Sequence, residues 1–157
     1  MPELTLKVLP QHFAVCRLPS TAEIPGWVFK SPFFSITRTE DELSVVCPEK
    51  RLPPAGSRPE GTGDSPDEGR HHRCRNEAAF MLTERNWRAL QVEGPLDFSL
   101  TGVLSSLTAP LAEAGISVFA ISTYTTDYLL IKQEAMERTL KILGRFCKIY
   151  PDKNRLF

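Results

Sequence analysis

The sequence has little of what most enzymes and nucleic-acid-binding proteins need. It contains three histidines, and its 19 basic residues (Lys and Arg) equal its 19 acidic residues (Asp and Glu), so its formal net charge at pH 7 is zero. A chain without excess positive charge lacks the attraction that nucleic acids and anionic membranes require. No apolar run approaches the ~20 residues of a membrane-spanning helix, and the initial stretch MPELTLKVLPQ lacks the regions of a secretory signal. We therefore expect a cytoplasmic protein that binds neither nucleic acid nor membrane.

Cysteine and histidine are too scattered to indicate a catalytic or metal site. No CxxC pair occurs among the four cysteines, Cys16, Cys47, Cys74 and Cys147, and this spacing is typical of reduced thiols rather than of a disulfide framework. His71, His72 and Cys74 lie close together, but no second ligand pair occurs at the spacing of a zinc site. A catalytic base must be held on a rigid element, and His71 and His72 lie in a segment rich in proline and glycine. The sequence thus predicts no enzyme activity, no metal and no cofactor.

The 157 residues suffice for one domain or for two very small ones that share a core. In the first half, LTLKVL alternates as a half-buried strand does, and HFAVCRL, which follows Pro10, is expected to be its hairpin partner. STAEIPGWVF offers Ser20 or Thr21 as the N-cap of a helix, which the internal Pro-Gly pair limits to a turn or two. FFSITRT and ELSVVC predict two further strands joined by a charged turn at residues 40–42. The first half is therefore expected to be ββαββ.

The composition changes abruptly at residues 48–76. This segment holds five of the 13 prolines and four of the nine glycines, carries charges of both signs and is almost free of apolar residues. It cannot bury enough apolar surface to offset the entropy lost on ordering. We expect a flexible insertion between two structured halves.

The second half has a clearer pattern. WRALQVEG, ISVFAIS and DYLLIK predict three strands. Between the first two, Leu104, Leu107 and Leu111 fall at helical spacing, Gly115 is a natural C-cap, and Pro110 is expected to bend the helix. EAMERTLKILGRF is amphipathic and predicts a last helix. The order βαββα predicts an α+β fold with helices on one face of an antiparallel sheet.

The link between the last two predicted strands, STYTTD, is rich in polar groups. Ser122, Thr123 and Thr125 offer hydroxyls, Tyr124 can cover an aliphatic or cationic side chain, and Asp127 can accept charge-assisted hydrogen bonds from an ammonium or guanidinium group. Aspartate is also a common turn residue before a strand. The residues alone leave two interpretations open, a polar hairpin and a binding site for a small zwitterion.

A second polar feature lies where the first helix of this half begins, in SLTGV at residues 99–103. A helix start offers unpaired N–H groups and a partial positive charge, which suit a carboxylate, and Gly102 would let a ligand approach the backbone. Ser99 or Thr101 is expected to cap this helix whether or not a ligand binds. Gly102 can equally serve close packing of the helix on the sheet.

Taken together, these motifs resemble those of a known family. EGPLDFSLTGVLSSLTAPLAEAGISVFAISTYTTDYLLI closely resembles the ACT domain, in the branch related to the CASTOR arginine sensors and to short bacterial ACT-domain proteins. The resemblance spans about Trp87 to Leu143, with weaker similarity over Leu4 to Cys47, and rests on LTGVL, APLAEAGISVF and STYxTDYxLI. It implies tandem ACT-like ferredoxin folds of βαββαβ type. The implied domains are a degenerate ACT-like half at 1–47, the flexible insertion at 48–76 and an ACT domain at 77–157.

The resemblance also implies a regulatory protein that binds a free amino acid at an ACT–ACT interface. This chain has one ACT pair where the metazoan arginine sensors have two, so the interface would require a homodimer. Arginine is the first candidate ligand on resemblance alone, and Ser117 and Val118 would lie where the partner domain's strand meets the ligand. The candidate ligand-binding residues are Ser99, Leu100, Thr101, Gly102, Val103, Ser117, Val118, Thr123, Tyr124, Thr125 and Asp127.

Two other functions fit the same layout. An RNA-binding RRM domain also has a sheet and two helices, but it displays basic residues beside aromatic ones, and SVFAISTY has no basic residue. An ACT-like scaffold that docks on another protein without sensing anything is the stronger alternative. Both interpretations can hold together, because a sensor must also report to a signalling partner protein.

Overall fold

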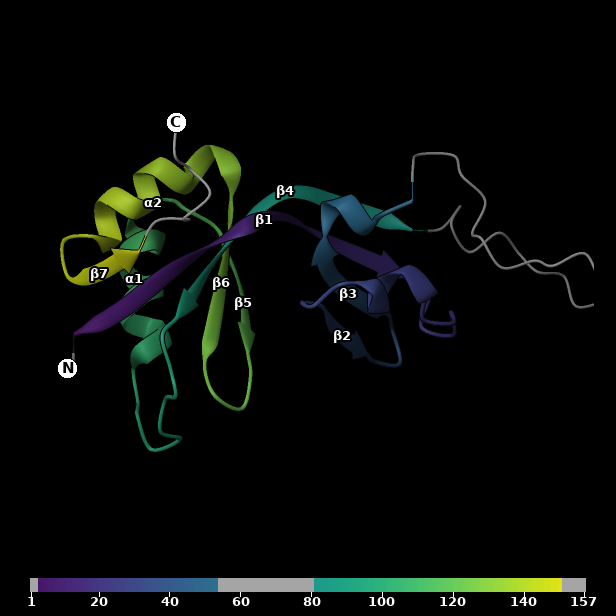
Figure 1. The fold of residues 1–157 in the computed structure, drawn as a ribbon, viewed down its shortest axis with the longest axis horizontal. Coiled ribbons are helices and arrows are strands. Elements are labelled where there is room, and N and C mark those ends of the chain that lie inside the picture. The colour runs from purple at the N-terminus through teal and green to yellow at the C-terminus, as the bar shows by residue number, and fades with distance from the viewer. Residues whose placement is uncertain (1–2, 54–80, 151–157) are drawn as a thin grey trace, which may run out of the picture. The chain divides into compact units, whose positions relative to one another are not determined.

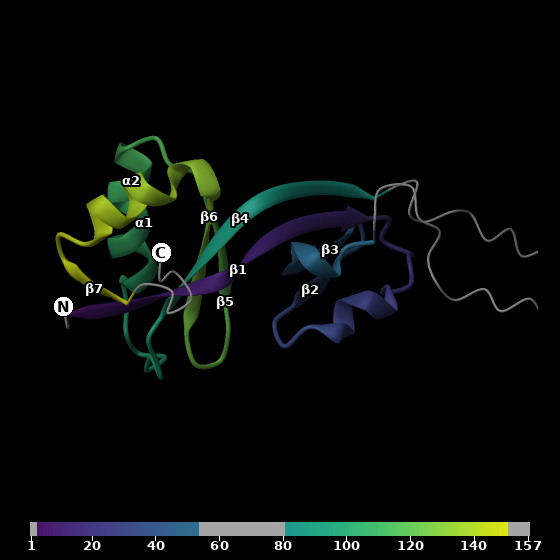
Figure 2. The same ribbon diagram turned by 45° about the horizontal axis from the view of Figure 1, so that its top comes forward.

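The computed structural model describes residues 3–53 and 81–150, which divide into two compact units. Unit 1 combines the described residues up to Phe13 with those from Asn86 onward, and unit 2 runs from Ala14 to Arg85. Two long strands that are neighbours in the sheet, β1 (Leu4–Leu18) and β4 (Leu82–Val92), contribute to both units (Figure 2).

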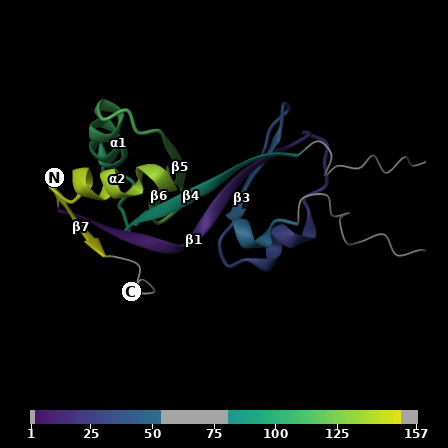
Figure 3. The same ribbon diagram turned by 90° about the horizontal axis from the view of Figure 1, so that it is seen from above.

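Unit 1 is a sheet with two helices on one face (Figure 3). Its strand order is β7-β1-β4-β6-β5, where the last three strands along the chain are β5 (Val118–Ser122), β6 (Asp127–Lys132) and β7 (Cys147–Tyr150). β4 pairs antiparallel with β6, and β6 with β5, whereas β7 pairs parallel with β1. From β4 to β7 the elements run βαββαβ. The expected α+β class is confirmed, and the strand β7 completes an order that the sequence pattern left at βαββα.

Both predicted helices of unit 1 are present, as α1 (Val103–Glu113) and α2 (Met136–Leu143), the latter preceded by a 3-10 turn at Gln133–Ala135. α1 is continuous through Pro110. Its predicted C-terminal glycine, Gly115, has a positive φ of 69°. The N–H of Ile116 donates to the carbonyl of Leu111 at 2.9 Å, and the N–H of Gly115 donates to that of Ala112 at the same distance. This pair of bonds is the Schellman motif, which ends a helix without leaving its last carbonyls unpaired.

The core of unit 1 lies between the helices and the alternate strand residues that face them. Its fully buried members are Leu6, Leu90, Val92, Leu107, Leu111, Leu129, Ile131 and Leu143. Each large aliphatic side chain stabilises the fold by about 1.5–3 kcal/mol when it is withdrawn from water. The helical period of α1 and the strand alternation of β4 and β6 are therefore both explained by this one core.

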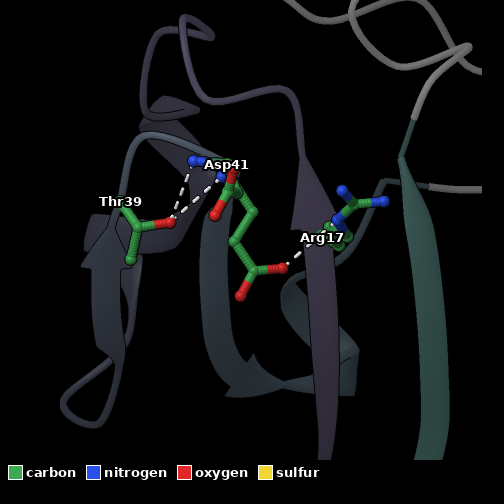
Figure 4. Close-up of polar contacts among 4 residues, drawn as sticks. Arg17, Thr39 and Asp41 are labelled. Carbon is green, nitrogen blue, oxygen red and sulfur yellow. Dashed lines mark hydrogen bonds and ion pairs between the residues drawn. The ribbon is translucent and has the colours of Figure 1, made fainter.

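Unit 2 contains the hairpin of β2 (Ser35–Arg38) and β3 (Leu43–Pro48), which pair antiparallel as the sequence predicts. The expected charged turn joins them: the Thr39 hydroxyl accepts from the backbone N–H groups of Asp41 and Glu42, each at 3.2 Å (Figure 4). Arg17 forms an ion pair with Glu42 at 3.2 Å. A separate core that includes Val28, Leu43, Val45 and Cys47 stabilises this unit.

Two local expectations for the first half are wrong, and a third, a helix of one or two turns, is met in its length but not in its start. LTLKVL and HFAVCRL do not form a hairpin but one continuous strand, β1, in which Pro10 is exposed; the fixed φ of proline suits extended backbone, so proline need not end a strand. Ser20 and Thr21 cap no helix. The helix expected there is a 3-10 helix at Gly26–Lys30, which starts after Pro25 and has no side-chain cap.

The insertion expected at 48–76 begins with ordered residues, because Pro48 ends β3 and Glu49–Arg51 form a 3-10 helix. Its remainder, including His71, His72 and Cys74, lies outside the described residues. The domains expected at 1–47 and 77–157 remain a prediction. The two compact units have other boundaries, because the first part of β1 belongs to unit 1 together with the second half of the chain. No helix within the described residues has the length and apolar character that crossing a membrane requires.

Candidate functional site

Two polar segments of unit 1 meet at one end of its sheet. One is the loop between β4 and α1, residues 93–102, and the other is the link between β5 and β6, residues 123–126; Figure 1 shows both at the same end of the unit. A hollow of about 210 Å³ lies between them. It is lined by Leu96, Asp97, Phe98, Leu100, Val103, Ser122, Thr123, Tyr124, Thr125, Thr126 and Asp127.

The link is a tight turn closed by threonines. The N–H of Thr123 donates to the carbonyl of Thr126 at 2.8 Å, and the Thr123 hydroxyl donates to the same oxygen at 2.9 Å. Before and after this turn, the paired residues Ser122 and Asp127 are joined by a hydrogen bond of 2.5 Å from the serine hydroxyl to the carboxylate. The Asp127 carboxylate is therefore held at the last rung of the β5–β6 hairpin, at the edge of the hollow.

The loop before α1 presents a second carboxylate. Asp97 accepts a hydrogen bond from the N–H of Ser99 at 2.7 Å, which is the local bonding typical of aspartate ahead of a helix. Hydrogen bonds from the Ser99 side chain and from its backbone lower the pKa of Asp97 below its ordinary value. Asp97 is thus ionised throughout the neutral range.

An aromatic pair forms part of the lining of the hollow. The rings of Phe98 and Tyr124 meet edge to face, with centroids 4.9 Å apart and an interplanar angle of 83°. Both are largely exposed, Phe98 at 74% and Tyr124 at 81%. Apolar side chains with this much exposure are suited to covering a ligand or a second protein surface.

The start of α1 is open. Gly102 occupies the N-cap position with φ 78° and ψ 5°, and no side chain caps the helix, so the expectation that Ser99 or Thr101 caps it is wrong. A Cβ on Gly102 would have free space, its nearest neighbour being the Ser105 hydroxyl at 4.0 Å. The positive φ, rather than crowding, therefore requires glycine here. A side-chain cap is absent because the chain enters the helix through this left-handed residue.

The structure brings together about half of the predicted site residues. Those that line the hollow are Leu100, Val103, Thr123, Tyr124, Thr125 and Asp127. Ser99, Thr101 and Gly102 are their neighbours in the chain but do not line it. Ser117 and Val118 lie at the other end of the hairpin, since Val118 pairs with Ile131 while Ser122 pairs with Asp127. Their predicted role on a partner's site stays a prediction.

Five lining residues were absent from the predicted set: Leu96, Asp97, Phe98, Ser122 and Thr126. Of these, Ser122 had been noted in the STYTTD link for its hydroxyl but not included in the set. Asp97 had a signal in the sequence, because aspartate followed two residues later by serine ahead of a helix is a local hydrogen-bonding pattern. Thr126 had none. It is 5% exposed, and only the packing of the link against β4 distinguishes it from the exposed Thr125.

The lining can bind groups of either charge. It offers two carboxylates, several hydroxyls and the open helix start, and no histidine, cysteine, lysine or arginine belongs to it. Among the residues at 3–53 and 81–150, no group of three or more His, Cys, Asp or Glu side chains is placed to hold a metal ion. The hollow can accept hydrogen bonds from a cation and donate to an anion.

The sequence of this region matches a family model. Residues 82–145 match the ACT domain, and a second model, for an N-terminal domain, matches residues 11–55. The chain therefore contains an ACT domain at these residues. The matched range runs from the first residue of β4 to just beyond α2, so the hollow lies within the ACT domain.

The chain is similar in sequence to proteins named as arginine sensors and similar in fold to the regulatory subunit of an enzyme. The human protein "Cytosolic arginine sensor for mTORC1 subunit 1" is 33% identical over 126 residues, which is 75% of this chain and 32% of the relative. The crystal structure of protein Atu0741 from Agobacterium tumefaciens is 27% identical, with a TM-score of 0.77 and coverage of 100% of this chain and 99% of the other. The regulatory subunit of aspartate kinase from Thermus thermophilus shares the fold at 11% identity, with a TM-score of 0.55 over 89% and 95% of the two chains. The chain spans about a third of the length of the curated arginine sensors it matches.

Proposed function

We propose that this ACT-domain protein is a regulatory protein that binds a free amino acid in the hollow between the β4–α1 loop and the β5–β6 link. The observation that carries this proposal is the lining: one hollow contains two carboxylates, Asp97 and Asp127, and the first residue of the uncapped helix α1, Val103. An amino acid presents one ammonium and one carboxylate. These are the two groups that such a lining can satisfy.

The ammonium end, or a cationic side chain, would bind at Asp127. A carboxylate accepts hydrogen bonds from an ammonium or guanidinium group, and the charge on both partners strengthens them. Asp127 already accepts one bond from Ser122 at 2.5 Å, which orients it and leaves further acceptor capacity. Among the described residues, no basic side chain lines the hollow, so none within the lining competes with a cationic ligand for Asp127.

The carboxylate end would bind at the start of α1. The first N–H groups of a helix have no partner within the helix and carry part of its positive dipole charge. Val103 begins α1 and lines the hollow, and the Gly102 position supplies no side-chain cap to compete with a ligand. An anionic group would therefore replace a missing cap.

A second copy of the chain would close the site. The hollow of about 210 Å³ is smaller than the ~300–1,000 Å³ of pockets that bury most of a small ligand. Phe98 and Tyr124 are exposed beside it and would pack against the second copy. We therefore propose a homodimer with the ligand at its ACT–ACT interface, in which Ser117 and Val118 would face the site of the partner subunit.

Arginine is the first ligand to test, because the relatives with 33% identity are named as arginine sensors. The same name describes them as cytosolic, which is also the location we propose here. Binding would act as a signal if it changed the affinity for a signalling partner protein. A scaffold that binds a partner without any ligand is the alternative function.

A thermal-shift screen of the twenty amino acids on the purified full chain tests this proposal. A ligand at 100 times its dissociation constant adds about 2.7 kcal/mol of stability, which raises the melting temperature of a chain of this size by roughly 5–10 °C. We expect one amino acid, or one chemical class, to give this shift. Asp127→Asn should abolish it, because the variant removes the charge while keeping an acceptor for the Ser122 hydroxyl.

The matched control is Asp41→Asn, which makes the same chemical change at an exposed turn of unit 2, far from the hollow in sequence and outside its lining. Asp41→Asn should leave the shift intact. If no amino acid at millimolar concentration raises the melting temperature, the sensing function is wrong and the scaffold function stands in its place.

A further inference from the structure

Thr126 is the buried member of an otherwise exposed link. Its neighbours Thr123, Tyr124 and Thr125 are exposed to solvent, whereas only 5% of the Thr126 surface is exposed. Its N–H donates to the Thr123 hydroxyl at 3.2 Å, and its carbonyl accepts the two bonds from Thr123 described above. The backbone of Thr126 thus closes the turn, and its hydroxyl takes no part in these turn hydrogen bonds.

The side chain of Thr126 instead forms a hydrogen bond to the neighbouring strand, β4. The Thr126 hydroxyl donates to the carbonyl of Val92, the last residue of β4. The backbone ladder between β4 and β6 has its final rung at Gln91 and Tyr128. The hydroxyl therefore continues the connection past the point where the ladder ends, at the level of the hollow.

The loop that follows Val92 is fastened to the same link. The N–H of Leu96 donates to the carbonyl of Thr125 at 2.8 Å. At Gly94 the backbones approach so closely that a Cβ would lie 2.7 Å from the same Thr125 oxygen. Because Leu96 immediately precedes Asp97, and Thr126 immediately precedes Asp127, these contacts fix the separation of the two carboxylates of the hollow.

We propose that Thr126 is a positioning residue of the site: its hydroxyl bond to the Val92 carbonyl holds the β5–β6 link against the β4–α1 loop and so sets how Asp97, Asp127 and the start of α1 face a ligand. Thr126 need not touch the ligand to do this. The role in ligand binding rests on the proposed function, whereas the role in holding the two segments together does not.

Three variants of the full chain separate the hydroxyl from the shape of the side chain. Thr126→Val keeps the shape and removes the hydroxyl, and Thr126→Ser keeps the hydroxyl. The matched control is Thr139→Val, which removes a fully buried hydroxyl that has no hydrogen-bond partner in the described part of the chain. Each protein is examined by amide hydrogen exchange at Leu96 and Thr123 and by calorimetric titration with the amino acid that stabilises the wild type.

Thr126→Val should speed exchange of both amides at least tenfold and weaken binding of the amino acid at least tenfold. Thr126→Ser should restore both, and Thr139→Val should change neither. If Thr126→Val does not fold, Thr126→Ala takes its place, since it cannot crowd the site.

If both amides of Thr126→Val exchange at the wild-type rate, the proposal is overturned. It is also overturned if exchange is faster but the affinity for the amino acid is unchanged, because Thr126 would then stabilise the fold without positioning the site. If no amino acid binds the wild type, the proposed function fails by itself. The exchange rates still test whether the hydroxyl holds the two segments together. Faster exchange in Thr126→Val that is absent from Thr126→Ser supports this role, and unchanged exchange overturns it.

Discussion

At the scale of single residues, the site depends on positions where adding or removing a single group would change how its two segments pack. Gly102 is required by its positive φ, and Gly94 by the closeness of the Thr125 carbonyl. The hydroxyl of Thr126 and the carboxylates of Asp97 and Asp127 are each fixed by a named hydrogen bond. These residues lie on segments that pack against each other, so a change at one is transmitted to the rest.

Gly94→Ala tests the close approach of loop and link. The added Cβ would meet the Thr125 carbonyl at 2.7 Å and the Thr126 Cβ at 3.3 Å, so one backbone segment must move. We expect a loss of about 1–3 kcal/mol in the free energy of unfolding, the usual cost of overpacking, measured by urea denaturation. The control Gly26→Ala adds the same atom where nothing lies within 4 Å and should stay within about 0.5 kcal/mol of wild type. Equal effects of the two substitutions would contradict this account of Gly94.

At the scale of elements, α1 combines two functions that place opposite demands on it. Its buried residues Val103, Leu107 and Leu111 anchor it on the sheet, while its start stays uncapped and faces the hollow. Pro110 lies inside the helix and cannot donate to the carbonyl of Ser106. The stability of α1 therefore comes from its packing on the sheet rather than from intrinsic helix propensity.

Pro110→Ala should make the protein more stable. Alanine restores a backbone donor and is about 3 kcal/mol more favourable than proline within a helix, an advantage reduced by about 0.4–1 kcal/mol because the unfolded chain becomes freer. We expect a net gain of about 1–3 kcal/mol in urea denaturation followed by circular dichroism. Pro32→Ala, at an exposed loop position, serves as the control and should be neutral or slightly destabilising. A loss of stability in Pro110→Ala would show that the proline is needed for the packing of α1.

At the scale of the whole molecule, two cores are connected by shared strands. The core of unit 1 includes Leu107, and that of unit 2 includes Leu43. β1 and β4 each contribute residues to both units. If one unit unfolds, it releases strands on which the sheet of the other unit depends.

The two units should therefore unfold together. Each contains one tryptophan, Trp27 in unit 2 and Trp87 in unit 1, so Trp27→Phe and Trp87→Phe yield two proteins with one fluorescent reporter each. We expect coincident urea transitions from the two reporters. Leu43→Ala or Leu107→Ala, each about 2–5 kcal/mol destabilising, should shift the transition seen by either reporter. Separate transitions, or a shift confined to the unit that carries the substitution, would exclude this coupling.

The sequence by itself determined the elements whose residues repeat with a clear period. Local patterns predicted α1, α2, β2, β3, β5 and β6, and the helical spacing of α1 agrees with its buried residues Val103, Leu107 and Leu111. The motifs of the second half also carried the family resemblance, which the ACT-domain match confirms. The same local information located the polar segments before α1 and between β5 and β6. It could not show that β1 continues through Pro10, because proline is compatible with both a turn and an extended strand. The residue pattern also did not show β7, whose four residues pair with β1 at the other end of the chain; only the family resemblance implied a final strand.

Only the tertiary structure decided which polar residues share a site. Asp97 and Asp127 lie 30 positions apart in the sequence, and they line one hollow because contacts between Thr126 and Val92 and between Leu96 and Thr125 join their segments. Thr125 and Thr126 are identical in type and adjacent in sequence, yet one is exposed and the other is buried against β4. Periodicity describes which face of its own element a residue occupies. What that face meets depends on the packing of the other elements, and this packing created the hollow.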